Sequence, residues 1–252
     1  MPRLLGIESV FNAEFERNCF ATPSSLLREL NMPTNIDHIV VAAQTLEQGI
    51  SYIEQQFAVT VPFGGVHPLM GTHNCLMQAG ENLFFEIIAI NPQSMLDAQL
   101  SIKQPRWFAL DDPLLQTRLK QGPKLLTWVI NSSDFEATKN TGIYQHTTAH
   151  VITRGDLSWQ FALPEDGSLL AAGLLPYILQ WQGAHPAKNM QDNGCTLQSI
   201  TMHHPQPEWL EQQLSLVGAQ HLVSINALDK NQTAFFESKF LTPKGLVTLS
   251  SQ

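Results

Sequence analysis

The feature that most constrains the fold is an order of predicted elements that recurs along the chain. Residues 35–42, "NIDHIVVA", alternate and are rich in β-branched side chains, which is typical of a strand. Residues 45–57 place apolar side chains on one face of a helix, namely Leu46, Ile50, Ile53 and Phe57. "THNCLMQAG" and "LFFEIIAI" predict two further strands, and the same order begins again at "KLLTWVI" and at "TLQSITMHH". We therefore predict an α+β fold of repeated βαβββ modules.

The modules are expected to pair, because a unit of roughly 50 residues is too small to bury both faces of its own sheet. The predicted organisation is an N-terminal extension at 1–34, a paired domain at 35–187 and an additional βαβββ-like module at 188–252, packed on the same domain. The paired domain divides into modules 35–92 and 124–187, joined by linker 93–123. This linker is long for a loop, which suggests a function or an added element. Within it, "DDPLLQTRLKQG" predicts a short helix.

The composition argues against several partners and chemistries. A net charge of −8 provides no basic surface for nucleic acid, and no apolar run approaches the ~20 residues that a membrane span needs. The three cysteines lie far apart and the N-terminus does not resemble a secretory signal, so we expect a cytoplasmic protein. The sequence contains no G-x-S-x-G, P-loop or G-x-G-x-x-G motif, which argues against a serine hydrolase and a nucleotide cofactor.

Four stretches carry a family resemblance: "DHIVVAAQTLEQGISYIEQQFAV", "GGVHPLMGTHNCLMQAGENLFFEIIAI", "PRWFALDDP" and "LLPYILQWQGAHPA". Together they resemble the glyoxalase-like domain proteins of the vicinal oxygen chelate superfamily, from about residue 35 to residue 187. The resemblance implies paired βαβββ modules whose mixed sheets curl into an open barrel around one pocket, with helices outside. It also implies an enzyme that often holds a divalent metal. Other members of the superfamily only bind small molecules, as in bleomycin resistance.

The resemblance places the metal ligands on the first and last strands of a module. His38 and Glu86 match these positions, and His73 would supply a third ligand if its strand turns the same face to the pocket. An imidazole and a carboxylate are part of the donor set that binds zinc, iron, manganese or nickel. The alternative is a hydrogen-bonded core histidine and a carboxylate paired with an arginine such as Arg106. In either case Glu86 needs a partner, because an unpaired buried carboxylate costs several kcal/mol.

The segment from Pro62 to Gly71 contains glycines and prolines that we expect to interrupt regular structure. His67 would then lie on a turn at the pocket rim, where it is a candidate general acid or base; the alternative is an exposed turn residue. His73 is a second candidate, or else a core residue bonded to the backbone. Asn74 could donate to a developing oxyanion or simply satisfy local backbone groups.

The linker and the second module supply the remaining candidates for substrate binding. Arg106 could bind an anion while Trp107 and Phe108 form an aromatic wall, or the two rings could anchor the linker. Alignment of the modules sets Thr127 opposite His38 and Gln180 opposite Glu86. A threonine is rarely a metal ligand, so the second half-site is expected to contact substrate instead. His185, in "GAHPA", resembles a rim position of the family.

Three functional hypotheses remain open, of which the last is a purely structural or regulatory pairing through the additional C-terminal module. The first is a lyase, isomerase or dioxygenase that acts on a carbonyl or vicinal-oxygen substrate with a divalent metal. The second is a metal-free protein that binds or sequesters a small molecule, which the threonine in the second half-site favours. The expected partner is thus a small molecule. A homodimer is a candidate assembly, because members of the superfamily often dimerise; pairing within one chain through the third module is the alternative.

Overall fold

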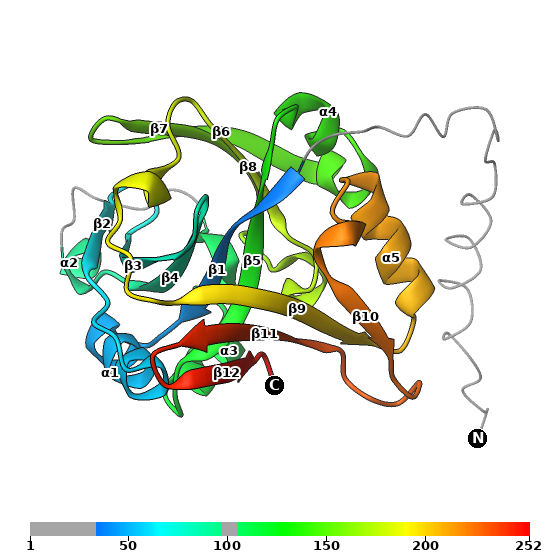
Figure 1. Cartoon of the computed structure of the whole chain (residues 1–252). Coiled ribbons are helices and arrows are strands. Elements are labelled where there is room, and N and C mark those ends of the chain that lie inside the picture. Colours follow the sequence, from blue (N-terminus) through cyan, green and yellow to red (C-terminus); the bar gives the residue numbers. More distant parts are fainter. Residues whose placement is uncertain (1–33, 97–104) are drawn as a thin grey trace, which may run out of the picture. The chain divides into compact units, whose positions relative to one another are not determined.

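The computed structural model describes residues 34–96 and 105–252 (Figure 1). Nearly all of the predicted N-terminal extension, and part of the linker, therefore lie outside the described residues. Across the described ranges, none of the helices is long and apolar enough to cross a lipid bilayer. The strands form one sheet of eight and one sheet of four.

The first two modules repeat one element order and share the eight-stranded sheet. The first contains β1 (Thr34–Ala42), α1 (Leu46–Phe57), β2 (Phe63–His67), β3 (Thr72–Gly80) and β4 (Leu83–Ile90). The second contains β5 (Lys124–Ser132), α4 (Phe135–Lys139), β6 (Thr147–Arg154), β7 (Leu157–Pro164) and β8 (Tyr177–Trp181). The strand order is β2-β3-β4-β1-β5-β8-β7-β6, with β1 and β5 antiparallel where the modules meet. The predicted α+β class with a curled, mixed sheet is confirmed.

The linker contains α2 (Pro92–Leu96), a 3₁₀ turn (Trp107–Ala109) and α3 (Pro113–Leu119). The predicted short helix is confirmed as α3, and Asp112 caps it by accepting from the backbone N–H groups of Leu114 and Leu115. The glycine-containing segment that was expected to be irregular instead holds β2. This edge strand pairs with β3, and its register shifts at Gly64.

The third segment forms the four-stranded sheet from β9 (Thr196–His204), α5 (Pro207–Leu216), β10 (Ser224–Ala227), β11 (Phe235–Thr242) and β12 (Gly245–Ser250). Its element order repeats that of the modules, but its pairing does not. The first strand of each earlier module lies parallel to the last strand, whereas β9 lies parallel to β10 and antiparallel to β11. The similar order therefore produces a different sheet.

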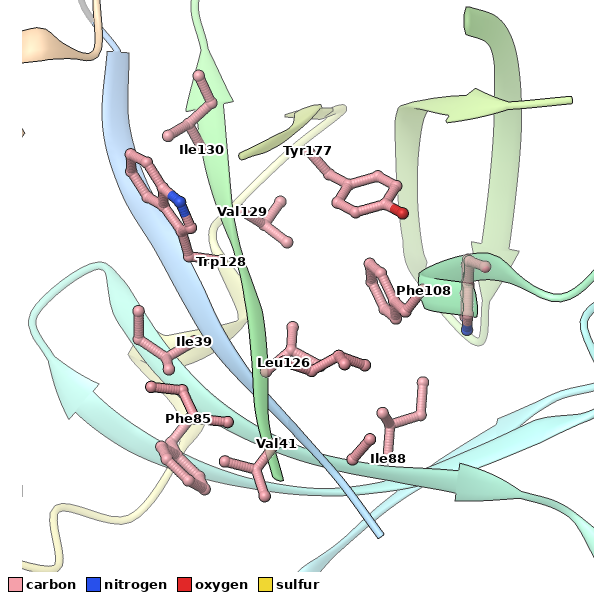
Figure 2. Close-up of a cluster of buried hydrophobic side chains, with 14 of the residues drawn as sticks. Ile39, Val41, Phe85, Ile88, Phe108, Leu126, Trp128, Val129, Ile130 and Tyr177 are labelled. Carbon is pink, nitrogen blue, oxygen red and sulfur yellow. The ribbon is translucent and has the colours of Figure 1, made fainter. Parts of the chain in front are cut away.

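Apolar side chains cover both faces of the eight-stranded sheet. On the outer face, Phe85 of β4 contacts Phe57 of α1 and Phe240 of β11, with ring centroids 5.7 and 5.5 Å apart. On the other face, Phe108 points toward Tyr177 of β8, and the two rings meet edge to face at 4.8 Å (Figure 2). The outer contacts fix α1 and the four-stranded sheet against the first module, which leaves the inner face to form a pocket.

Helix α1 packs unusually closely against the sheet at Gly49. Thr45 caps the helix, since its side chain accepts from the backbone N–H of Gln48 at 3.2 Å. A Cβ atom added at Gly49 would overlap the Cγ2 methyl of Ile87 and lie 3.0 Å from the Cβ of Ala43. Glycine is therefore required by the distance between helix and sheet, in spite of its poor helix propensity.

We predict that Gly49→Ala destabilises the protein by about 1–3 kcal/mol, because overpacking outweighs the gain in helix propensity. Ser51→Ala is the matched control, since Ser51 is exposed on the same helix. This control should leave the stability unchanged or slightly higher. Urea denaturation followed by circular dichroism measures both variants. A Gly49→Ala variant as stable as Ser51→Ala would show that the helix can move away from the sheet at little cost.

Candidate active site

A pocket opens on the inner face of the eight-stranded sheet. We call it the inner pocket and define it by five polar residues that line it: His38, His67, Asn74, Glu86 and Arg154. The rest of its wall is mostly apolar and includes the aromatic rings of Phe84, Trp107, Phe108, Trp159, Phe161 and Trp181. Its free volume of about 40 Å³ holds a few water molecules or a small reacting group.

Behind this pocket lies Asp37, a fully buried carboxylate with three hydrogen-bond donors. Nδ1 of His38 lies 2.6 Å from one carboxylate oxygen. Nε1 of Trp181 lies 2.7 Å, and Nε2 of His185 3.0 Å, from the other. The register of β1 against β5 shifts between Ile36 and His38, so that Asp37 is the extra residue of a β-bulge. The bulge lets two consecutive side chains, Asp37 and His38, interact on one side of the strand.

The hydrogen bonds to Asp37 determine which ring nitrogen of His38 and of His185 carries a proton. Burial by itself would raise the pKa of this carboxyl. The hydrogen bonds from His185 and His38 together lower it by more, so the pKa of Asp37 lies below its usual value. An ionised carboxylate only accepts, so each histidine presents an N–H to it. His185 also accepts from the backbone N–H of Ala187 at Nδ1. In His38 the proton on Nδ1 leaves Nε2 directed toward the pocket.

Nε2 of His38 lies 3.5 Å from Oε2 of Glu86, and both side chains are buried. The imidazole stacks on Phe84 with the ring centroids 4.4 Å apart, which holds its plane. Asn74 donates from Nδ2 to Oε1 of Glu86 at 2.6 Å. Nη1 of Arg154 in turn donates to Oδ1 of Asn74 at 3.2 Å. A continuous polar chain therefore runs from the buried Asp37 to the guanidinium.

His67, predicted as a rim residue, is buried at the end of β2. Its Nε2 lies 3.4 Å from Nη1 of Arg154, and its Nδ1 lies 3.1 Å from the hydroxyl of Thr72. Since the guanidinium can only donate, Nε2 accepts and Nδ1 carries the proton. Burial, aided by the charge of Arg154, lowers the pKa of His67 from 6.5 to about 3. His67 is thus a neutral histidine in the pocket wall.

His73 does not border the inner pocket, contrary to the expectation from the sequence. Asn74 and Leu76 of β3 face the pocket, so strand alternation turns His73 to the opposite face. There burial lowers the pKa of His73, and Glu47 of α1 opposes this effect. The sequence did not show which side chains of β3 point toward the pocket, and the expectation for His73 depended on this. In the structure Leu76 lies opposite Glu86, which decides the face.

Four of the predicted substrate contacts also lie elsewhere. His185, predicted at the rim, is buried against Asp37 and does not line the inner pocket. Arg106 forms an ion pair with Asp111 and does not line the pocket, although Trp107 and Phe108 do. The hydroxyl of Thr127 is directed to the carbonyl of Gly173 at 3.4 Å. Gln180 donates to the carbonyl of Ser133 at 2.8 Å, while its strand neighbours Leu179 and Trp181 face the pocket. The alignment of the modules chose the wrong face of β8.

Sequence reasoning missed three residues of the site: Asp37, Arg154 and Trp181. Strict alternation assigned Asp37 to the face opposite His38, because a bulge leaves no signal in a two-residue period. Arg154 ends "HVITR", 80 residues after Asn74, and no local pattern connects the two. The one available signal was the adjacent pair Asp37-His38 itself, since an aspartate often orients a histidine.

The donor set does not fit the divalent metal that the resemblance implies. Only Nε2 of His38 and Oε2 of Glu86 are available, and their 3.5 Å separation would suit a shared ion. The third expected ligand, His73, faces away, and Nε2 of His67 faces a guanidinium. A catalytic ion normally has three protein ligands, and the positive charge of Arg154 opposes a second cation. Within the described ranges, no three His, Cys, Asp or Glu side chains could hold a metal together.

The comparisons with known proteins agree with this fold. The model of a family described as a glyoxalase-like domain matches residues 36–218. None of the curated proteins compared with the chain matches it. A hypothetical protein from Staphylococcus aureus is 15% identical, with a TM-score of 0.49, over 86% of this chain and 85% of the other.

Two enzymes of known structure have lower TM-scores. Methylmalonyl-CoA epimerase from Mycobacterium tuberculosis is 16% identical, with a TM-score of 0.37, over 59% of this chain and 87% of its own. A mutant of 4-hydroxymandelate synthase from Streptomyces coelicolor is 10% identical, with a TM-score of 0.43, over 87% of this chain and 63% of its own. Similarities of this size concern the fold and do not extend to the chemistry.

We predict that His67 makes the protein less stable in mild acid. The pKa of His67 is about 3 in the folded protein and 6.5 in the unfolded chain. Below pH 6.5 the unfolded chain therefore binds a proton at His67 that the folded protein does not. Stability is then lost as pH falls from about 6.5 toward 3, by at most about 1.4 kcal/mol per pH unit. Urea denaturation between pH 7.5 and 5 should show a flatter dependence for His67→Gln than for wild type.

The exposed His221 provides the control, because His221→Gln should leave the pH dependence unchanged. Asp37 does not confuse the comparison, since its low pKa affects stability only at more acidic pH and in both proteins alike. Parallel curves for wild type and His67→Gln would mean that His67 takes up its proton normally in the folded protein.

Proposed function

Because the chain belongs to the glyoxalase-like domain family, we propose that it is a small-molecule enzyme that moves a proton on a carbon beside a carbonyl group. One observation carries the proposal: Nδ1 of His38 lies 2.6 Å from the buried carboxylate of Asp37, while Nε2 of the same ring lies 3.5 Å from Oε2 of Glu86 in the inner pocket. A base with a fixed tautomer, next to a carboxyl group that can exchange the proton, is the arrangement that general base catalysis requires.

The proposed step uses only groups of this chain. Nε2 of His38 removes a proton from the carbon, the C–H bonding electrons form the C=C bond of an enolate, and the carbonyl oxygen takes the negative charge. Asn74 orients the carboxyl group of Glu86 through the 2.6 Å hydrogen bond. Return of the proton to the opposite face of the same carbon completes an epimerisation, and departure of a group with its bonding electrons from the carbon on the other side completes a lyase reaction.

The surroundings of the base support the same chemistry. Phe84, Trp107 and Phe161 give the pocket an apolar wall and leave room for a reacting group of only a few atoms. In such surroundings charge–dipole interactions with a developing enolate are stronger than in water. The side chain of His67 is neutral here, so it does not compete with His38 for a proton at ordinary pH.

The aromatic wall also supports a second candidate function, the binding of a small molecule without turnover. Trp159 and Trp181 lie with ring centroids 5.1 Å apart and both line the inner pocket. Such rings provide a large apolar contact surface for a flat ligand. In this alternative the polar chain orients the ligand and transfers no proton.

We predict that the wild-type protein exchanges carbon-bound protons of an enolisable ketone or 2-oxo acid with solvent. Proton NMR in D₂O would follow phenylacetone, phenylpyruvate and hydroxyacetone, and at least one should lose its signal faster than in buffer. His38→Gln should slow this exchange by about 100-fold or more, because general base catalysis of this kind contributes about 10²–10⁴-fold.

Glu86→Gln should lower the exchange rate as well, while the exposed residues His221 and Glu81 provide controls in which His221→Gln and Glu81→Gln retain it. Thermal melting of every variant separates a chemical loss from unfolding. Tight binding without exchange would favour the binding protein. Exchange that survives His38→Gln in a folded variant would remove His38 from the role of base.

A further inference from the structure

Arg154 is a half-buried cation without a carboxylate partner. No Asp or Glu oxygen in residues 34–96 or 105–252 lies within 4.0 Å of its nitrogens; its contacts are the neutral Asn74 and His67. Burial lowers its pKa, and the negative charge of Glu86 in the same pocket opposes this effect. Removing a cation from water is costly unless an anion compensates, so a pocket with an unpaired guanidinium favours an anionic ligand.

Two glycines of β2 leave the space through which this side chain reaches the pocket. β2 and β6 are the two edge strands of the eight-stranded sheet, and Arg154 extends from the end of β6 to residues of β2 and β3. A Cβ atom at Gly65 would lie 3.0 Å from both Cδ and Nη1 of Arg154. At Gly64 a Cβ atom would lie 2.6 Å from Oδ1 of Asn74, the oxygen that Arg154 contacts. The two glycines leave space for this contact across the sheet edges.

Arg154 stands between the inner pocket and a second, larger space. This outer pocket has about 490 Å³ of free volume and shares Leu76, Arg154 and Pro186 with the inner one. Its wall includes the apolar side chains of Phe63, Leu157 and Met190. A ligand can therefore place a small reacting group beside His38, a charged group at Arg154 and an apolar body in the outer pocket.

We propose that Arg154 binds a carboxylate on the substrate, and that its fixed positive charge takes the electrostatic role for which the family resemblance suggested a divalent metal. The substrate class is then a 2-oxo acid with an apolar body. This inference rests on the proposed function for the reaction, but not for the binding. A carboxylate suits a single planar guanidinium, whereas a phosphate dianion is usually held by several donors.

Binding of two nearly isosteric probes tests the proposal without any turnover. Phenylpyruvate carries a carboxylate where phenylacetone carries a methyl group, so the ratio of their dissociation constants isolates the anionic contact. Titration calorimetry on wild-type protein should show tighter binding of phenylpyruvate by at least about tenfold, the effect of one charge-assisted hydrogen bond or more. Arg154→Gln should abolish this preference and leave the affinity for phenylacetone within about twofold.

Arg154→Lys should retain part of the preference, because the charge remains while the planar fork is lost. Arg118→Gln on the exposed face of α3 is the control and should behave as wild type. Dialysis against a chelator should leave the phenylpyruvate affinity unchanged; an affinity that falls and returns with added Zn²⁺ would overturn the proposal. Inorganic phosphate as a competitor should be weaker than pyruvate.

Equal affinities of wild type for the two probes, no binding of phenylpyruvate or pyruvate, or a preference that persists in folded Arg154→Gln would each overturn the proposal. These outcomes are distinct from failure of the proposed function. If wild type prefers the carboxylate probe, Arg154→Gln loses this preference and no proton exchange occurs in D₂O, the inference is supported and the proposed enzymatic function is contradicted. Proton exchange on phenylpyruvate that Arg154→Gln leaves unchanged, with equal affinities of wild type for the two probes, would do the reverse.

Discussion

The carboxylate of Asp37 is the interaction on which the candidate site depends. A fully buried charge is tolerated only when donors surround it, and here His38, Trp181 and His185 provide them. Two of these residues come from the second module or the segment after it, so the hydrogen bonds join the modules across about 145 residues of sequence. The same bonds fix the tautomer and orientation of His38. Stability and chemistry therefore share one buried group.

From this group the polar chain extends through Glu86 and Asn74 to Arg154, and the charges along it alternate with neutral amide and imidazole groups. Such an arrangement has a negative end inside the protein and a positive end toward the larger outer space. A substrate that becomes an enolate meets a base at one end and a cation at the other. The physical basis of the proposed function is this polarity, set within mostly apolar walls.

The histidines of "GGVHPLMGTH" illustrate how little the residue types alone decide. His67 and His73 lie six positions apart with similar neighbours, yet only His67 reaches the inner pocket. Gly64 and Gly65 are not turn residues; they belong to β2 and allow the approach of Arg154. A glycine in a strand interior often marks such a close approach. The partner that approaches comes from another module, so the sequence around the glycines could not identify it.

By itself the sequence determined the α+β class, most of the element order and the positions of the two helices that Thr45 and Asp112 cap, since these follow from local periodicity and capping residues. The motifs that carry the resemblance identified the family. It also singled out His38 and Glu86, which the structure brings to one pocket. Only the tertiary structure decided which face each strand turns inward, and so placed Arg154 inside and His73 outside. Facing depends on register and on bulges such as that at Asp37, and these are set by pairing between strands distant in sequence.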